Sequence, residues 1–324
     1  MHLPSSRRLA AALAALPLLV FSQQPPPAAE KPDEQATFRA DTRLVPLYAS
    51  VLDKNGRLVT NLPREAFRVY ENDVEQKIKI FRREDVPVSM GLIIDNSGSM
   101  RDKRKRVEGA ALSLVKSSNR EDEVFIVNFN DDAYLDQPFT NDIKKMEQAL
   151  TKIDSRGGTA MRDAISMSID YLKQNAKRDK KILLVVTDGD DNTSAVTLEK
   201  LLAKTQQSEV LVYTIGLLSE EGRREAKRAK RALSALSEAS GGVAYFPDQA
   251  VEVDKFALQV ANDIRNQYVI AYTPTLAELD GTFRRIKVTA NGPNRPVVRT
   301  RTGYYATADQ QSTRRPAAAS SLRQ

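Results

Sequence analysis

The side chains in this sequence that could do chemistry together are oxygen donors in three short stretches. The stretch IIDNSGSM presents Asp95, Ser97 and Ser99 at the end of an apolar run. Two further stretches, SRGGTAMRDA and TDGDDN, present Thr159 after two glycines and Asp188 after another apolar run. Carboxylate and hydroxyl oxygens are ligands for hard cations such as Mg²⁺, Mn²⁺ or Ca²⁺. If folding brings these five residues together, they can form a divalent-cation site.

The composition excludes most other chemistries. The 324 residues contain no cysteine and one histidine, His2, which lies in a segment with the features of an export signal. The mature chain therefore cannot use Ser-His-Asp or Cys-His catalysis, zinc bound by imidazole or thiolate, or thiol redox chemistry. Without disulfides, a hydrophobic core must hold the fold.

The net charge is +7, with basic clusters at 101–106 and 223–231. Aromatic residues make up 6% of the chain, and no nucleic-acid-binding motif is present. Clustered positive charge alone is typical of solvated helix faces, so we expect no nucleic-acid partner.

Short apolar runs alternate with amphipathic helical patterns across the middle of the chain. Such strands, buried on both faces and separated by helices, predict an α/β fold with a doubly wound, mostly parallel sheet. Ligands bind such sheets at the carboxyl ends of the strands, where the three oxygen-rich stretches fall. Strands are predicted at 88–94, 122–129, 181–187, 209–216 and 242–246, and helical patterns include 161–172, 223–238 and 253–264.

Strand patterning also brackets this α/β region. A hairpin is predicted around Asn55-Gly56, a second strand pair around Glu71–Asp73, and further strands at 267–275, 283–290 and 296–306. These flanks could pack as one small β module or stay separate, and the sequence leaves both open. The predicted organisation is a signal peptide at 1–22, a Pro-rich linker at 23–37, an N-terminal β segment at 38–85, the α/β domain at 86–266, a C-terminal β segment at 267–306 and a disordered tail at 307–324.

The N-terminus predicts export. Arg7 and Arg8 precede LAAALAALPLLVF, an apolar run that is too short to span a bilayer. We expect a secretory signal and a periplasmic or secreted protein. The alternative is an uncleaved anchor, which would be the one route to membrane association.

Asp-x-Ser-x-Ser after a buried strand, Gly-Gly-Thr before a helix and Thr-Asp-Gly after a strand together resemble a von Willebrand factor type A domain. The resemblance covers about residues 86–266 and implies a Rossmann-like fold. All positions of that family's metal-ion-dependent adhesion site match, namely Asp95, Ser97, Ser99, Thr159 and Asp188.

The resemblance implies that the two serines and the threonine bind Mg²⁺ directly, while the two aspartates act through water. It also implies a protein partner whose Asp or Glu completes the coordination sphere. The flanking β segments resemble those of a group of exported bacterial proteins that carry the same domain.

The leading interpretation is therefore an exported, non-enzymatic binding protein. One alternative is a Mg²⁺-dependent phosphohydrolase with Asp95 as its nucleophile. Such enzymes usually carry a second aspartate two positions later, where this chain has Ser97. Another alternative is a structural module whose metal site is incidental.

The stretch DGDDNTSAVTLE places oxygen side chains at four positions of an EF-hand calcium loop. However, Thr193 occupies the position of the required glycine, and a strand precedes the loop. We therefore expect no separate calcium loop, and interpret Asp190 and Asp191 as residues that solvate the loop or tune its charge.

The basic run Arg101, Lys103, Arg104, Lys105 and Arg106 would begin the helix after IIDNSGSM. We interpret it as exposed surface charge. A functional alternative is that it steers an acidic partner toward the cation.

Overall fold

The computed structural model describes residues 43–307 apart from 84, 152–154 and 219–221, and these residues fall within one compact unit. The signal peptide predicted at 1–22, the linker predicted at 23–37 and the tail from residue 308 onward lie outside the described residues. Within the described ranges, no helix is both long and apolar enough to cross a membrane.

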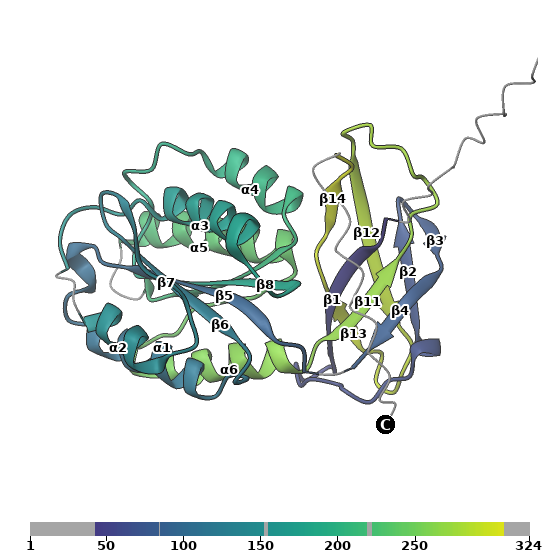
Figure 1. The fold of residues 1–324 in the computed structure, drawn as a ribbon, viewed down its shortest axis with the longest axis horizontal. Coiled ribbons are helices and arrows are strands. Elements are labelled where there is room, and N and C mark those ends of the chain that lie inside the picture. Colours follow the sequence, from purple (N-terminus) through teal and green to yellow (C-terminus); the bar gives the residue numbers. More distant parts are fainter. Residues whose placement is uncertain (1–42, 84, 152–154, 219–221, 308–324) are drawn as a thin grey trace, which may run out of the picture. The chain divides into compact units, whose positions relative to one another are not determined.

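A six-stranded sheet forms the centre of the α/β domain, in the order β10-β9-β8-β5-β6-β7 (Figure 1). All neighbouring strands run parallel except β7, which pairs antiparallel with β6 at the edge. The prediction missed β7, an edge strand interrupted by Pro138. The strands are β5 (Val88–Asp95), β6 (Glu123–Phe129), β7 (Ala133–Thr140), β8 (Lys180–Thr187), β9 (Val210–Gly216) and β10 (Ala244–Tyr245).

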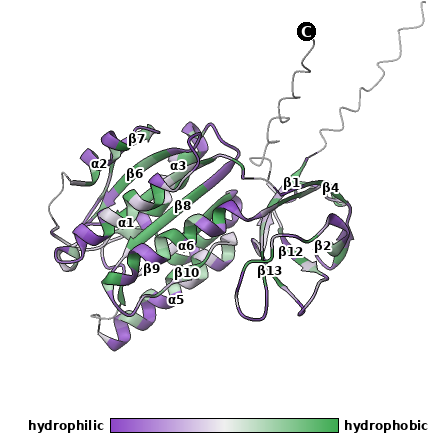
Figure 2. Ribbon diagram, turned by 90° about the horizontal axis from the view of Figure 1, so that it is seen from below, coloured by the Kyte–Doolittle hydropathy of each residue, from purple (hydrophilic) through white to green (hydrophobic). Residues whose placement is uncertain are grey.

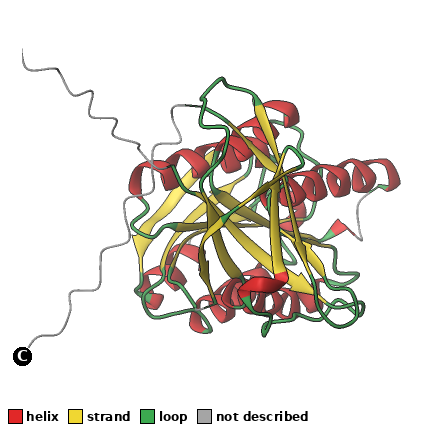
Figure 3. Ribbon diagram, turned by 90° about the vertical axis from the view of Figure 1, so that its right-hand side faces the viewer, coloured by secondary structure: helices red, strands yellow, loops and turns green. Residues whose placement is uncertain are grey.

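Helices cover both faces of this sheet (Figures 1 and 3). Helices α1, α2 and α6 pack on one face, and α3, α4 and α5 pack on the other. The structure therefore confirms the predicted doubly wound fold. The helices are α1 (Arg104–Lys116), α2 (Ile143–Thr151), α3 (Met161–Asn175), α4 (Leu198–Gln207), α5 (Arg223–Ser240) and α6 (Val253–Arg265).

The central strands β6 and β8 are mostly hydrophobic in Figure 2, and the neighbouring β5 shows why. Successive side chains point to opposite faces: Leu92 and Ile94 enter the core beneath α1 and α6, and Ile93 enters the core beneath α3. Gly91 leaves room for the Phe125 ring. A Cβ at residue 91 would lie 2.4 Å from Cζ of Phe125, which is too close for two carbon atoms. Both helical layers thus fix the strand that ends in Asp95.

The flanking strands form two antiparallel four-stranded sheets, in the orders β13-β1-β11-β4 and β14-β12-β2-β3. Strands from before and after the α/β domain alternate in the first sheet, and in the second sheet β12 from after the domain pairs with β2 from before it. Both sheets contribute to one apolar core. The flanks are therefore one β module, into which the α/β domain is inserted. Its strands are β1 (Val45–Leu52), β2 (Phe67–Glu71), β3 (Val74–Gln76), β4 (Ile78–Arg82), β11 (Tyr268–Tyr272), β12 (Phe283–Ala290), β13 (Val297–Arg299) and β14 (Gly303–Tyr305).

The predicted hairpin around Asn55-Gly56 is present but short. Gly56 adopts a positive φ of 75°, the Val59 amide donates to the carbonyl oxygen of Val51 at 2.8 Å, and the pairing between the two arms is one antiparallel bridge, between Leu52 and Leu58. β1 itself pairs with β11 and β13, which lie more than 200 residues later in the sequence. Long-range pairing over an apolar core has outweighed the local turn signal.

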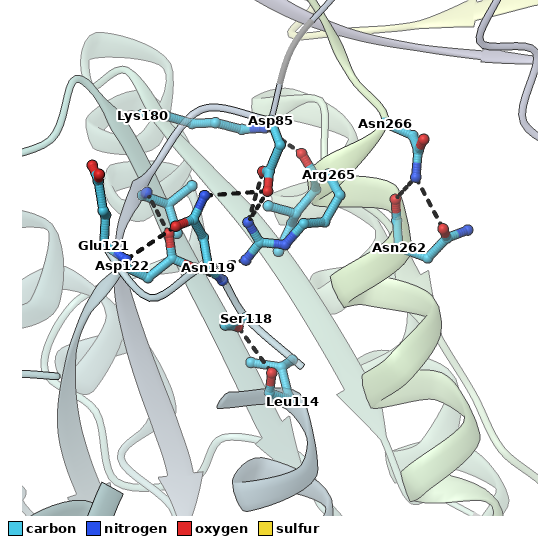
Figure 4. Close-up of polar contacts among 12 residues, drawn as sticks. Asp85, Leu114, Ser118, Asn119, Glu121, Asp122, Lys180, Asn262, Arg265 and Asn266 are labelled. Atoms are coloured by element: carbon cyan, nitrogen blue, oxygen red, sulfur yellow. Dashed lines mark hydrogen bonds and ion pairs between the residues drawn. The ribbon is translucent and has the colours of Figure 1, made fainter. Parts of the chain in front are cut away.

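The two crossings between the β module and the α/β domain are joined by ion pairs (Figure 4). Arg265, the last residue of α6, donates to both carboxylate oxygens of Asp85 at 2.6 and 2.8 Å. Its other amino group lies 2.6 Å from Asp122, which also accepts a hydrogen bond from the Val88 amide. The Arg265 guanidinium therefore links the segment where the chain leaves the α/β domain to the segment where it enters that domain.

Lys180, the first residue of β8, is buried near this junction, with 2% of its surface exposed (Figure 4). Its Nζ donates to the carbonyl oxygen of Ile264 at 2.6 Å and lies 5.2 Å from the ring centroid of Tyr48. Burial lowers the pKa of Lys180 to about 7, against the opposing attraction of nearby carboxylates such as Asp263. The folded protein thus holds this ammonium group at a free-energy cost.

Candidate metal centre

Asp95 is the last residue of β5, and none of its surface is exposed. Its Oδ1 accepts a hydrogen bond from the Ser97 amide at 2.8 Å, which closes a tight turn over the strand end. Its Oδ2 accepts from the Thr187 hydroxyl at 2.5 Å. Because β5 and β8 are paired neighbours, the Thr187 hydroxyl at the end of β8 holds the Asp95 carboxylate at the end of β5.

The two serines of the stretch lie side by side next to Asp95. The hydroxyl oxygens of Ser97 and Ser99 are 3.2 Å apart, and the Ser99 hydroxyl donates to Oδ1 of Asp188 at 2.8 Å. Asp188 directly follows β8, and 2% of its surface is exposed. The sheet edge therefore brings four of the predicted residues into one continuous hydrogen-bonded group.

Thr159 borders this group on a separate loop. Gly157, at φ +77°, accepts a hydrogen bond from the Gly98 amide at 3.3 Å, so the loop lies against the serine turn. The Thr159 amide donates to Oδ1 of Asn192 at 2.9 Å. Within the described part of the chain, the Thr159 hydroxyl makes no hydrogen bond, neither to the other four predicted residues nor to others.

Lys103 belongs to the centre, although no sequence pattern indicates it. Its Nζ lies 2.8 Å from Oδ2 of Asp188, and 6% of its surface is exposed. The interpretation of the basic run as exposed charge is therefore wrong for Lys103, while Arg101, Lys105 and Arg106 are exposed. A short 3-10 turn (Gly98–Met100) precedes α1 and shifts where the helix begins, which places Lys103 inside.

Side-chain contacts of Asp191 and Asp163 hold the loop after Asp188 against the start of α3, and we call these contacts the strap. Asp191 accepts from the Arg162 amide at 2.7 Å and pairs with its guanidinium at 2.8 Å. Asp163 accepts in return from the amides of Ala195 and Val196, both at 2.9 Å. Our interpretation of Asp191 as a solvating residue is therefore wrong. It caps α3 and fixes the distance between the two loops that carry Thr159 and Asp188.

Burial dominates the electrostatics of Asp95. It raises the pKa of the Asp95 carboxyl to about 6, against the hydrogen bonds from Ser97 and Thr187, which lower it. The neighbouring Asp188 carboxylate raises it further. An ionised Asp95 is thus unfavourable in this place without a nearby positive charge, and a bound cation would supply one.

The donor set fits a hard cation of small size. Adjacent ligands of an octahedral Mg²⁺ ion lie about 2.9 Å apart, given oxygen distances of about 2.0–2.1 Å. The 3.2 Å between the Ser97 and Ser99 hydroxyl oxygens is close to that spacing. Among the described residues, no group of three or more His, Cys, Asp or Glu side chains could hold a metal ion. Binding at this centre would therefore depend on hydroxyl ligands beside its two carboxylates.

Asp191→Ala is expected to weaken divalent-cation binding by about tenfold, because groups that orient metal ligands typically contribute that much. The loss would come through Asn192 and Thr159, which the strap holds in place. Calorimetric titration with Mn²⁺ measures it. Asp190→Ala is the matched control, since the Asp190 carboxylate pairs with the exposed Arg228 at 2.6 Å. Equal losses in both variants would contradict a role for the strap.

Comparisons with known proteins agree with this fold. Residues 90–190 match the family model of the von Willebrand factor type A domain. Inter-alpha-trypsin inhibitor heavy chain H4 of Bos taurus is 22% identical over 220 residues, which cover 61% of this chain and 23% of that protein. Integrin alpha-11 of Mus musculus is 31% identical over 109 residues, which cover 32% of this chain and 9% of that protein.

This chain therefore spans less than a quarter of the length of either relative. Among solved structures, a von Willebrand factor type A protein from Catenulispora acidiphila has a TM-score of 0.49 and 12% identity. That similarity covers 86% of this chain and 78% of the other.

Proposed function

Because the chain contains a von Willebrand factor type A domain, we propose that it is an exported, non-enzymatic binding protein that presents a divalent cation to an acidic residue of a protein partner. Such domains generally mediate protein–protein interaction and adhesion. Ser97, Ser99 and Thr159 would hold the cation, preferably Mg²⁺ or Mn²⁺. Asp95 and Asp188 would support it through water.

The observation that carries the proposal is the pair of serine hydroxyls, 3.2 Å apart, supported by two buried carboxylates. Neutral hydroxyl ligands leave the cation with much of its charge, so it can attract a further carboxylate. Export rests on the N-terminal sequence, in which a basic pair precedes a short apolar run.

The geometry disfavours the phosphohydrolase alternative. A nucleophilic carboxylate needs an oxygen that can reach the phosphorus atom of a substrate. Asp95 has no exposed surface, and both of its oxygens accept hydrogen bonds, from the Ser97 amide and the Thr187 hydroxyl. Asp95 is therefore suited to support other groups rather than to attack a substrate.

Calorimetric titration with Mn²⁺ and Mg²⁺ tests the cation. We expect the wild-type protein to bind one ion, and Ser97→Ala combined with Ser99→Ala to reduce the affinity by at least about a hundredfold. Ser118→Ala is the matched control, because the Ser118 hydroxyl donates to Leu114 at the far end of α1 (Figure 4). Equal binding by both variants would refute the site.

A second measurement tests the partner. The wild-type protein should retain an envelope protein in the presence of Mg²⁺ and release it with EDTA, and the double serine variant should not retain it. Capture that survives EDTA would instead support a structural module with an incidental metal site.

A further inference from the structure

Lys103 places a positive charge in the metal centre. Its ammonium group lies 2.8 Å from Oδ2 of Asp188, with both side chains less than 10% exposed. A buried ion pair is expensive to desolvate and persists only when its geometry is good and its remaining hydrogen-bonding capacity is used. Here the second carboxylate oxygen of Asp188 accepts from Ser99 at 2.8 Å.

This arrangement leaves the cation-binding atoms accessible. A hydroxyl group has one proton to donate and two lone pairs to offer. Ser99 directs its proton to Oδ1 of Asp188, so one lone pair remains for a cation when the Ser97 hydroxyl donates to the other. Lys103 contacts the opposite oxygen of the same carboxylate, Oδ2. The ammonium group and a divalent cation can therefore occupy the centre together.

The net charge of the cation-loaded centre then determines how strongly it binds a carboxylate. Ionised Asp95 and Asp188 would together balance the formal charge of a divalent cation, so the loaded centre would have no net charge to add to the ion's own attraction for a third carboxylate. Lys103 restores a net positive charge. In a partly desolvated site, one unit of charge within a few ångströms is a large electrostatic effect.

We propose that the positive charge of Lys103 acts in opposite directions on the two ligands of this centre. It weakens the binding of the divalent cation, and it strengthens the binding of an acidic partner to the cation-loaded centre. The proposal rests on the function proposed above for the same site. It makes Lys103 a specificity-determining residue that selects an anionic ligand through its charge.

The test compares Lys103→Met with Lys103→Arg. Mn²⁺ affinity is measured by calorimetry, and binding of acetate to the Mn²⁺-loaded protein is measured by water-proton relaxation, since acetate displaces water from the ion. We expect Lys103→Met to bind Mn²⁺ at least about tenfold more tightly and acetate at least about tenfold more weakly. Lys103→Arg keeps the charge and should retain acetate binding within about threefold of the wild type.

A double variant gives a test that does not depend on a buried unpaired carboxylate. Lys103→Met combined with Asp188→Asn removes one charge of each sign, so the loaded centre keeps the wild-type net charge. At saturating Mn²⁺, its acetate affinity should be at least about threefold higher than that of Lys103→Met alone. An acetate affinity as weak as that of Lys103→Met would overturn the charge argument.

The results separate the two proposals. Weaker Mn²⁺ binding by Lys103→Met would mean that Lys103 merely positions Asp188, and would overturn this inference while leaving the metal site intact. Unchanged acetate binding by Lys103→Met would overturn it as well. Failure of the wild-type protein to bind Mn²⁺ would instead refute the proposed function itself.

Discussion

Lys103→Met is expected to lower the free energy of unfolding of the metal-free protein by about 3–5 kcal/mol, the usual effect of removing one partner of a buried ion pair. The variant leaves the Asp188 carboxylate, 2% exposed, without its cation. The hydrogen bond from Ser99 cannot replace a full charge at 2.8 Å. Urea unfolding with EDTA at neutral pH measures the loss.

A saturating divalent cation should return much of this stability, because it replaces the missing charge and binds the folded state alone. Lys105→Met, at an exposed position in the same run, should change the free energy of unfolding by less than about 0.5 kcal/mol. Combining Lys103→Met with Asp188→Asn should lose less than Lys103→Met alone. A larger loss in the combination would show that the Asp188 charge is not what destabilises the single variant.

Lys180→Met is expected to stabilise the protein at pH 6 by about 2–4 kcal/mol. Burial lowers the pKa of Lys180 from 10.5 to about 7, and each tenfold loss of proton affinity corresponds to about 1.4 kcal/mol against the charged form. The gain is reduced by the lost hydrogen bond to Ile264 and the lost contact with the Tyr48 ring. Methionine fills a similar volume without a charge.

The pH dependence follows from the lowered pKa of Lys180. Below pH 7 the folded and unfolded states both carry the proton, so the full cost is present in the wild type. Between pH 7 and 10.5 the unfolded state binds more protons than the folded state, and the cost disappears. The advantage of Lys180→Met should therefore shrink between pH 7 and 10.

Chemical denaturation of both proteins at pH 6, 8 and 9.5 checks this trend. Lys181→Met, on the next residue of β8 and half-buried, is the matched control for the loss of one lysine from this strand. An advantage of Lys180→Met that stays constant with pH would attribute the effect to packing rather than to charge.

The candidate centre could be predicted from the sequence as far as its oxygen donors. Asp95 and Asp188 end apolar strands, and Thr159 follows two glycines, so local patterns place all three at one edge of a parallel sheet. Lys103 could not be predicted, because it lies among five basic residues whose spacing gives no reason to turn one of them inward. The decisive contact is with Asp188, 85 residues away.

The same limit applies to the fold. The buried central strands and the helices α1, α3, α5 and α6 were predicted, since burial leaves a periodic trace in the sequence, whereas the shorter helices α2 and α4 were missed. β7 carries no such trace, because it lies at the sheet edge with much of its surface exposed and contains Pro138. The pairing of β1 with β11 likewise depends on segments more than 200 residues apart, and no local signal reports it.

The ion pair between Asp85 and Arg265 bears on the order in which the chain can fold during synthesis. β1 to β4 leave the ribosome early, but their partners β11 to β14 follow the whole α/β domain. Closing a flexible loop of the 180 residues that separate Asp85 from Arg265 would cost about 5 kcal/mol in chain entropy. A domain that folds first and brings its own ends together removes most of that cost. In the nascent chain, the α/β domain should therefore fold first and bring the early and late strands of the β module together. The β module should then complete its two sheets last.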